Sequence, residues 1–368
     1  MARLRRWPVV AAVLAVLLSL PAALNSIPVS NSTIPATTLL AKIRNSGSLG
    51  YSGYAEATGG LALPVTSRFG SLADLFGGHS QLRVWWRGAK DSRVDQVDVA
   101  GETDVHTDDS GTWSWNYEEN SATRIDSSIN PLVRLPSAAD LLPASLGRRL
   151  LSEAADGEVS RLDTVRIAGR TAAGLRLRPS DVATTIDHVD IWADTITGIP
   201  LRVEVYGAND ANPAMATEFL DFNATMPAAA TTRFLLPSGA ELNIEQQQNL
   251  SGALGRFFGD VPVPKTLAGI ALNGQLPSFG GVGVYGHGVT EFVAVPMTGR
   301  TANSLRRELL SAPGIADGPD GQSVVVGPLS LLLTSTLTPG GLYWLLTGTV
   351  TRATLTAAAA ELARFGGG

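Results

Sequence analysis

The sequence predicts an α+β fold: a curved antiparallel β-sheet covered by helices, followed by a smaller α+β domain. Three observations support this prediction. Between residues 81 and 222, apolar and polar residues alternate along successive short segments, as in an antiparallel sheet with one face in water. Residues 131–155 are rich in Leu and Ala at helical spacing and interrupt these segments. Residues 281–366 contain strand and helix patterns of their own.

The first predicted helix begins at Pro35, because proline is favoured in a first helical turn, and it ends before Asn45. Strands of the sheet are predicted at residues 51–58, 82–87, 93–99, 113–117, 165–167, 175–178, 189–191, 201–205 and 218–222. The C-terminal region predicts strands at 291–295, 323–326, 329–337 and 341–349, and helices at 302–310 and 354–363. The apolar face of the first sheet needs a cover, and the first helix and the Leu-rich insertion are the available material.

The chain has 368 residues, which is too long for one ordinary domain and suits two. The predicted division is residues 1–24 as a signal peptide or N-terminal anchor, 25–34 as a tether, 35–240 as the sheet domain, 241–280 as a connecting segment, and 281–366 as the small C-terminal α+β domain.

The N-terminus predicts export. Arg3, Arg5 and Arg6 precede an uncharged apolar run over residues 9–20. A run of this length suits a secretory signal and falls short of the about 20 residues that span a bilayer. A run extended to residues 7–24 could instead stay as an uncleaved anchor. We therefore expect an extracytoplasmic protein, secreted or held at the outer face of the cytoplasmic membrane.

Composition excludes several classes of function. The net charge of −5 argues against non-specific nucleic-acid binding, which needs basic patches. The absence of cysteine excludes disulfides, thiolate metal sites, thiol nucleophiles and a lipid attached through an N-terminal Cys. Only three lysines stand among 28 basic residues, and with the abundant Ala and Gly this indicates a high-GC bacterial source.

Catalytic and metal-binding patterns are weak. The four histidines are scattered, and we expect His79 and His106 in loops and His188 at a strand start. The stretch 281–286 matches G-x-G-x-x-G, but it leads into a strand, which favours a glycine-rich turn over a dinucleotide site. The sequence thus predicts a protein that is not an enzyme, with no catalytic residue, no metal site and no cofactor.

An acidic group surrounds the predicted hairpin of residues 104–119. Its members are Asp104, Asp108, Asp109, Glu118 and Glu119. Their spacing is not that of an EF-hand, so we expect solvated loop carboxylates, with weak calcium binding as the alternative.

The candidate binding site is the apolar concave face of the sheet. We expect the following side chains to share it: Leu82, Val84, Trp86, Trp113, Trp115, Tyr117, Leu175, Leu177, Val189, Ile191, Leu201 and Val203. The same residues suit an ordinary core, since burying each is worth about 1.5–3 kcal/mol. Both a ligand cavity and a filled core remain open, and a one-residue slip in register would move a strand's residues to the other face.

Several short motifs occur in one order along residues 35–240. They are Leu39-Leu40-Ala41, Tyr51-Ser52-Gly53, Leu82-Arg83-Val84-Trp85, Asp109-Ser110-Gly111-Thr112-Trp113, Ile191-Trp192-Ala193-Asp194 with Thr197-Gly198-Ile199-Pro200-Leu201-Arg202, and Phe234 with Pro237-Ser238-Gly239-Ala240. In these motifs the chain resembles the periplasmic lipoprotein carriers LolA and LolB and the sigma-factor regulator RseB, as a two-domain member of actinobacterial type. The resemblance implies an eleven-stranded half-barrel around an apolar cavity lidded by helices, which binds acyl chains or hydrophobic peptide segments.

Three hypotheses of function follow. The leading one is non-enzymatic binding of a hydrophobic ligand, an acyl chain, lipid or lipoprotein, in the concavity of the half-barrel. The alternative is an RseB-like regulator that binds the extracytoplasmic segment of a membrane-bound anti-sigma factor. A well-packed C-terminal domain with an exposed apolar patch would favour this regulator. A hydrolase is the third and least supported hypothesis.

Overall fold

The computed structural model describes residues 30–59, 78–98, 101–126, 137–208, 210–246, 261–274, 281–310, 314–335, 337–338 and 341–365. The predicted signal or anchor, residues 1–24, lies outside the described residues. Among the helices of the described part, none has the length and apolar character needed to cross a membrane.

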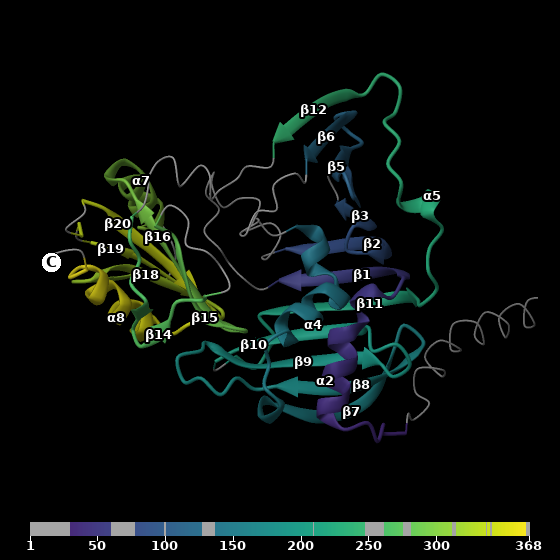
Figure 1. Cartoon of the computed structure of the whole chain (residues 1–368), viewed down its shortest axis with the longest axis horizontal. Helices are drawn as coiled ribbons and strands as arrows, with labels where there is room; N and C mark the ends of the chain where they lie inside the picture. The colour runs from purple at the N-terminus through teal and green to yellow at the C-terminus, as the bar shows by residue number, and fades with distance from the viewer. Residues whose placement is uncertain are drawn as a thin grey trace, which may run out of the picture.

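The larger domain contains one open, curved sheet of twelve strands (Figure 1). Its strands are β1 (Tyr51–Gly59), β2 (His79–Gly88), β3 (Asp91–Asp98), β4 (Gly101–Asp108), β5 (Gly111–Asn116), β6 (Ser121–Asp126), β7 (Val159–Ile167), β8 (Arg170–Leu177), β9 (Ile186–Asp194), β10 (Pro200–Gly207), β11 (Met215–Asn223) and β12 (Glu241–Gln246). Their order is β12-β6-β5-β4-β3-β2-β1-β11-β10-β9-β8-β7. Two antiparallel meanders, β1–β6 and β7–β11, are joined by the pairing of β1 with β11.

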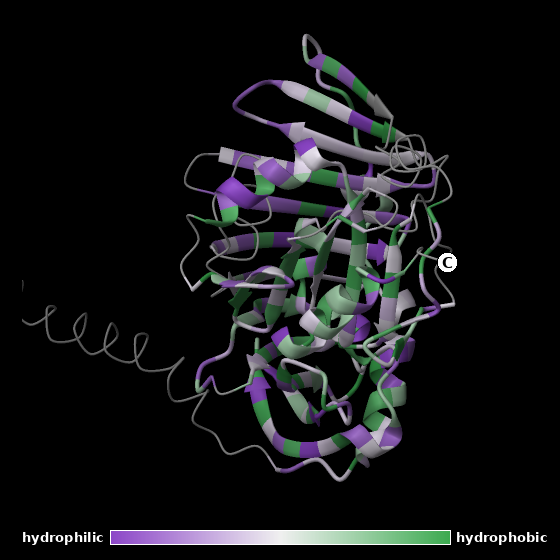
Figure 2. Ribbon diagram, turned by 90° about the vertical axis from the view of Figure 1, so that its left-hand side faces the viewer, coloured by the Kyte–Doolittle hydropathy of each residue, from purple (hydrophilic) through white to green (hydrophobic). Residues whose placement is uncertain are grey.

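The predicted α+β class with a sheet closed by helices is confirmed, and three strands of the sheet, β4, β6 and β12, fall outside the predicted ones. β12 begins at Glu241, in the predicted connecting segment, and pairs in parallel with β6 at the end of the sheet. The alternation of hydrophobic and hydrophilic residues along the strands is visible in Figure 2. The boundaries of the predicted domains stay a prediction.

Two helices cover one face of this sheet, α2 (Ala36–Arg44) and α4 (Pro143–Leu151). Short 3-10 helices η1 (Asn45–Ser48), η2 (Ala138–Leu141) and η3 (Asp156–Glu158) flank them. Helix α2 contacts β7 and β8, α4 contacts β10, and the two helices contact each other. We call this side of the sheet the helix-covered face.

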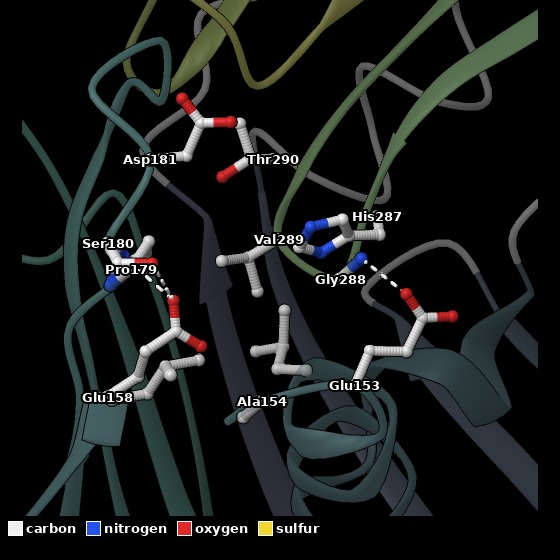
Figure 3. A pocket seen from close by; sticks show the side chains of 12 residues that line it. Glu153, Ala154, Glu158, Pro179, Ser180, Asp181, His287, Gly288, Val289 and Thr290 are labelled. Atoms are coloured by element: carbon white, nitrogen blue, oxygen red, sulfur yellow. Dashed lines mark hydrogen bonds between the residues drawn. The ribbon is translucent and has the colours of Figure 1, made fainter. Parts of the chain in front are cut away.

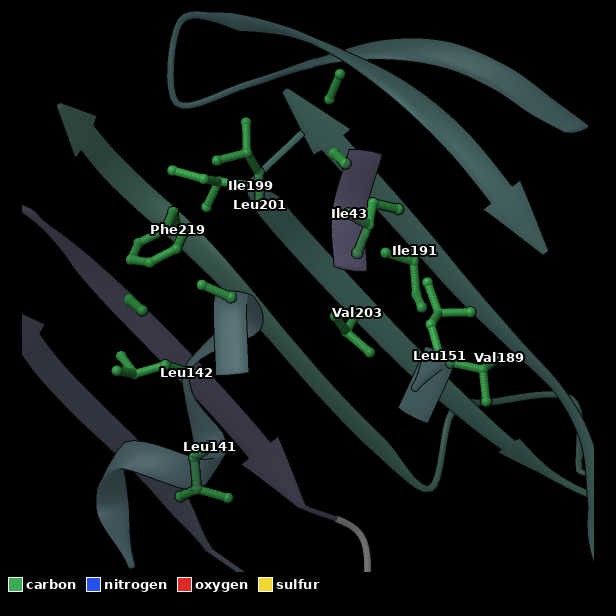
Figure 4. Close-up of a cluster of buried hydrophobic side chains, with 14 of the residues drawn as sticks. Ile43, Leu141, Leu142, Leu151, Val189, Ile191, Ile199, Leu201, Val203 and Phe219 are labelled. Atoms are coloured by element: carbon green, nitrogen blue, oxygen red, sulfur yellow. The ribbon is translucent and has the colours of Figure 1, made fainter. Parts of the chain in front are cut away.

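The main core lies between these helices and the sheet (Figure 4). Ile43 of α2, Leu151 from the end of α4, and Ile191, Leu201 and Val203 of the sheet have no exposed surface. The i, i+2 spacing on the strands and the i, i+4 spacing on the helices direct these side chains to one layer. The helices are thus held on the sheet mainly by apolar burial.

Residues 31–34, predicted as part of a tether, dock along the edge strand β7. The pairing of β7 with β8 shifts between Leu162 and Val165, which frees backbone groups of β7. The Thr164 amide donates to Asn31 Oδ1 at 2.9 Å, so the docked segment satisfies a group that the irregularity releases. The edge of the sheet at β7 is therefore partly covered.

The smaller domain is a six-stranded sheet with a helix on each face. Its strands, in the order β15-β16-β20-β19-β18-β17, are β15 (Gly283–His287), β16 (Thr290–Met297), β17 (Ala316–Gly318), β18 (Gly321–Val326), β19 (Leu329–Thr334) and β20 (Tyr343–Gly348). Helix α7 (Gly299–Leu309) packs with Leu333 and Leu345, whereas α8 (Arg352–Leu362) packs with Leu332 and Leu346. Neighbouring residues of a strand point to opposite faces, so the two helices cover opposite faces. The short hairpin β13 (Thr266–Leu267) and β14 (Ile270–Ala271) packs against α8 on its side.

Replacing Leu201 by alanine should destabilise the larger domain by about 3 kcal/mol, because a fully buried leucine loses its contacts and leaves a cavity. The matched control is Leu235→Ala, whose side chain is 77% exposed and which should change stability by no more than about 0.5 kcal/mol. Urea unfolding followed by tryptophan fluorescence measures both. Equal effects of the two substitutions would contradict the placement of the core.

Candidate functional site

Nine of the twelve predicted site residues lie in the core under the helices. They are Leu82, Val84, Trp86, Leu175, Leu177, Val189, Ile191, Leu201 and Val203. Each is at most 8% exposed, and together with residues of α2 and α4 they form one packed cluster. Their packing is that of a filled core, and their role as a ligand-binding surface stays a prediction.

Trp113, Trp115 and Tyr117 were expected on the same face, and the structure places them on the opposite one. Cross-strand partners share a face, and the register aligns Trp85 with Arg93, then His106, then Trp113. Trp86, by contrast, aligns with Ser92. The prediction of a common face is wrong for these three. Strand β2 has two neighbouring tryptophans, Trp85 and Trp86, which point to opposite faces, and the sequence pattern alone does not say which of them shares a face with Trp113.

Two of them, Trp113 and Trp115, contact a segment that crosses the face opposite to the helix-covered face, which we call the back face. We call residues 224–240, which connect β11 to β12 and include the short helix α5 (Ala229–Thr232), the strap. Phe234 of the strap stacks on Trp113 with ring centroids 5.0 Å apart and lies 6.4 Å from Trp115. Trp115 is buried, whereas Tyr117 is half exposed at the margin. The aromatic residues of β5 therefore fix the strap in place.

A buried ion network lies beside them. Arg93 binds Asp95 through two hydrogen bonds of 2.7 and 2.8 Å, and Asp104 through one of 2.8 Å. His106, expected in a loop, is buried in β4, where its Nδ1 lies 2.8 Å from the carbonyl oxygen of Thr232 in the strap. The expectation of a solvated loop carboxylate is also wrong for Asp104, which is 2% exposed, because it lies inside β4 between Asp95 of β3 and Trp115 of β5.

The buried network is better suited to holding a proton on Asp104 than to binding a metal ion. Burial and the neighbouring Asp95 raise the pKa of Asp104 to about 7, although Arg93 opposes the shift. Asp95, Asp104 and Glu102 each place an oxygen within 4.8 Å of the others, which resembles a cation site. Arg93 already binds both oxygens of Asp95, however, so a divalent cation would have to displace a guanidinium group.

Asp104 should make the stability of the larger domain fall as pH rises. Its pKa is higher in the folded chain than the ordinary 3.8, so the folded state holds a proton that the unfolded state releases. The stabilisation is complete below about pH 4, is lost between about pH 4 and pH 7, and is constant above that range. Urea unfolding of Asp104→Asn at pH 5 and pH 8 should show a smaller decrease than the wild type.

The control for this experiment is Asp109→Asn on the neighbouring turn, whose side chain is 90% exposed. It should retain the pH dependence of the wild type. Identical pH profiles for Asp104→Asn and the wild type would contradict a protonated Asp104.

The two domains meet through few but specific contacts. Val289, at the turn between β15 and β16, belongs to the core cluster of the larger domain although it lies in the smaller one. The Gly288 amide donates to Glu153 Oε2 at 2.8 Å. Thr184 and Val350 form an antiparallel bridge. The buried side chain of Val289 and the hydrogen bonds of the backbone thus hold the two domains together.

Two adjoining cavities open at this junction, and we call them together the junction groove. The first has a volume of about 280 Å³ and is shown in Figure 3. It is lined by Leu150, Glu153, Ala154, Glu158, Leu177, Pro179, Ser180 and Asp181 of the larger domain and by His287, Gly288, Val289 and Thr290 of the smaller. The second, of about 470 Å³, shares Glu153, Asp181 and His287 with the first and extends along the hairpin of β13 and β14.

The groove is acidic on its larger-domain side. Burial favours the neutral form of Glu158, but hydrogen bonds from the Ala155 and Ser180 amides outweigh it and lower the pKa of Glu158. Glu291 accepts a hydrogen bond from Asn273, which lines the second cavity, and burial and the charge of Glu153 raise the pKa of Glu291. Carboxylates beside an aliphatic floor suit a cationic group on an apolar stem, such as a lysine or arginine side chain.

None of the acidic groove residues was predicted from the sequence. Glu153 lies near the end of the Leu-rich insertion, and His287 directly follows the G-x-G-x-x-G stretch. That stretch enters β15 and ends in a tight turn in which Gly286 and Gly288 adopt positive φ angles of 95° and 63°. The expectation of a glycine-rich turn at residues 281–286 is wrong, because Gly283–His287 form strand β15 and the turn follows at Gly288 and Val289. Nothing local indicated that this turn would face Glu153.

No family model matches the sequence, and no curated protein matches it either. Among solved structures, a chain of the Pseudomonas aeruginosa MucA/MucB complex is 16% identical, covers 88% of this chain and 96% of its own length, and superposes with a TM-score of 0.50. MucB in complex with MucA(peri) is 15% identical over 88% of this chain and 97% of its own, at a TM-score of 0.48. A LolA superfamily protein from Nitrosomonas europaea is 13% identical over 55% of this chain and 99% of its own, at 0.25. The first comparison confirms the fold that the motifs indicated, and its coverage extends into both domains.

Proposed function

We propose that this chain is a non-enzymatic binding protein that acts outside the cytoplasmic membrane and holds an extracytoplasmic segment of a membrane-bound partner protein. The groove at the junction of the two domains carries this proposal. Its larger-domain wall and its smaller-domain wall come from separate folding units, so a bound segment contacts both domains at once. The signal-like N-terminus supports the location.

The packing of the larger domain supports a protein partner over an acyl chain. The predicted ligand face is filled by α2 and α4, and a long acyl chain would have to displace these helices. The first cavity of the groove, of about 280 Å³, is close to the lower limit of about 300 Å³ for small-molecule pockets, which suits one or two protein side chains. A chain of similar fold, MucB, is seen bound to MucA(peri). We therefore propose the extracytoplasmic segment of an anti-sigma factor as the partner.

The groove carboxylates give the expected partner a chemical character. Glu153 and Asp181 line both cavities, so a lysine or arginine of the partner would lie between them. Such charge pairs at a partly exposed surface weaken with ionic strength. We therefore expect a basic extracytoplasmic segment and binding that falls with added salt.

The double substitution Glu153→Gln and Asp181→Asn should weaken partner binding about tenfold, which corresponds to about 1.4 kcal/mol. The probes are labelled peptides that tile the extracytoplasmic segments of the source bacterium's anti-sigma factors, and fluorescence anisotropy measures their affinity. The control is Asp109→Asn, in the exposed turn between β4 and β5, which lines neither cavity of the groove. Undiminished binding by the double variant, or no binding by any peptide, would overturn the proposal.

A hydrophobic ligand with a polar head is the second candidate, and two incompletely satisfied groups in the core favour it. The Tyr51 hydroxyl and Arg148 Nη1 are both buried and interact with each other, and within the described residues neither has a further hydrogen-bond partner. The guanidinium of Arg148 lies 5.8 Å from the ring centroid of Trp86. Buried polar groups with too few partners cost free energy, and a carboxylate or phosphate head would satisfy both.

Native mass spectrometry of the exported chain tests this second candidate. If the ligand binds in the core, the wild type should co-purify with one equivalent of lipid. The amount of lipid should fall several-fold in Arg148→Leu and stay unchanged in the groove double variant. A bare protein mass, with no uptake of a fluorescent fatty acid, would exclude it and leave the groove as the binding site.

A further inference from the structure

Strand β12 forms an edge of the twelve-stranded sheet with an open side. Among the described residues it pairs only with β6, over six consecutive residues and without a shift in register. Natural edge strands are usually blocked by proline, lysine, a bulge or a covering segment. The sequence of β12, Glu-Leu-Asn-Ile-Glu-Gln, contains neither proline nor lysine. Within the described part of the chain, its outer backbone groups therefore have no strand partner.

Exposed aliphatic side chains accompany this edge. Leu242 and Ile244 are 44% and 71% exposed and lie opposite Ala122 and Arg124, on the same face as the strap. The end of the strap adds Leu235 and Leu236, which are 77% and 44% exposed. These four large aliphatic side chains are exposed within ten positions of the chain, and exposed aliphatic residues concentrated in this way are typical of a protein interface. We call these four residues the edge patch.

The charge next to the edge patch selects the occupant. Glu241 at the start of β12 and Glu119 in the turn between β5 and β6 are both exposed. In an antiparallel pair of two copies, the two Glu241 residues would lie at opposite ends of the paired strands, so their charges would contribute little to such a pair, and the test below includes a dimer as an outcome. A segment of another protein with a basic residue at this end would instead be attracted. Open backbone groups, the edge patch and the carboxylates thus all fit one extended, partly apolar, basic segment.

We propose that β12 receives an extended segment of a different protein as a thirteenth strand of the sheet. Aliphatic side chains at alternate positions of that segment contact Leu242 and Ile244, and a lysine or arginine at one end contacts Glu241. A six-residue strand is about 20 Å long, so the segment needs only six to eight residues. This surface is separate from the junction groove, and the inference does not depend on the function proposed for that groove.

Binding of designed peptides to the whole exported chain tests the inference. The probe is a labelled ten-residue peptide with isoleucine at three alternate positions, threonine between them and two lysines at its N-terminal end. The matched probe has two glutamates in place of the lysines. Fluorescence anisotropy should show at least tenfold tighter binding of the lysine peptide, and Ile244→Lys should weaken it at least tenfold. Leu220→Lys, on an exposed site of β11, should leave it unchanged.

Hydrogen exchange separates strand addition from other modes of binding. The bound lysine peptide should slow the exchange of amides in residues 241–246, since only backbone pairing protects them. Three results would each overturn the inference. They are unchanged exchange in residues 241–246, binding of the peptide by Ile244→Lys as tight as by the wild type, and a dimer of the chain that Ile244→Lys abolishes. The groove double variant, Glu153→Gln with Asp181→Asn, should bind the peptide like the wild type, so the two proposals can fail separately.

Discussion

The pairing of β1 with β11 is the contact on which the rest of the larger domain depends, because it joins two meanders into one sheet. The strands lie about 160 residues apart in the chain, so their pairing carries a large loop-closure cost and is expected to form late in folding. Aromatic residues stabilise this seam: Tyr51 of β1 lies 5.8 Å from Phe219 and 5.9 Å from Phe222 of β11. Gly53 is required there, since a Cβ atom would lie 2.5 Å from the carbonyl oxygen of Asp221.

Once the seam is formed, the two faces of the sheet take different roles. The helix-covered face is apolar and is filled by α2 and α4. The back face of β2–β5 holds a mixed layer, in which aromatic rings and the Arg93–Asp95–Asp104 network are sealed by the strap. Because the strap continues directly into β12, the contacts of Phe234 and Thr232 also position the open edge of the sheet. The buried network thereby links the interior of the sheet to a surface on which another chain can pair.

The junction between the domains holds them together through direct contacts and also leaves cavities open to solvent. Val289 and the bridge between Thr184 and Val350 anchor the smaller domain, while Glu153 and Asp181 line cavities that the anchors leave open. A ligand in this groove contributes contacts to both domains, so its binding would stabilise their relative position. Ligand sites are common at such domain interfaces, where concave surfaces form without disturbing either core.

The sequence by itself determined the class of the fold, the helix that begins at Pro35, and the alternation on β10 that buries Leu201 and Val203. These features depend on local periodicity and backbone preference, which a sequence expresses directly. Only the tertiary structure decided which face Trp113 occupies, because a period of two defines two faces without saying which one meets the core. His106 is buried against Thr232 of the strap, which lies 126 residues further along the chain, and the meeting of Glu153 with His287 depends on two domains docking. Long-range packing of this kind leaves no signal in the local pattern, and it is packing that created both candidate binding surfaces.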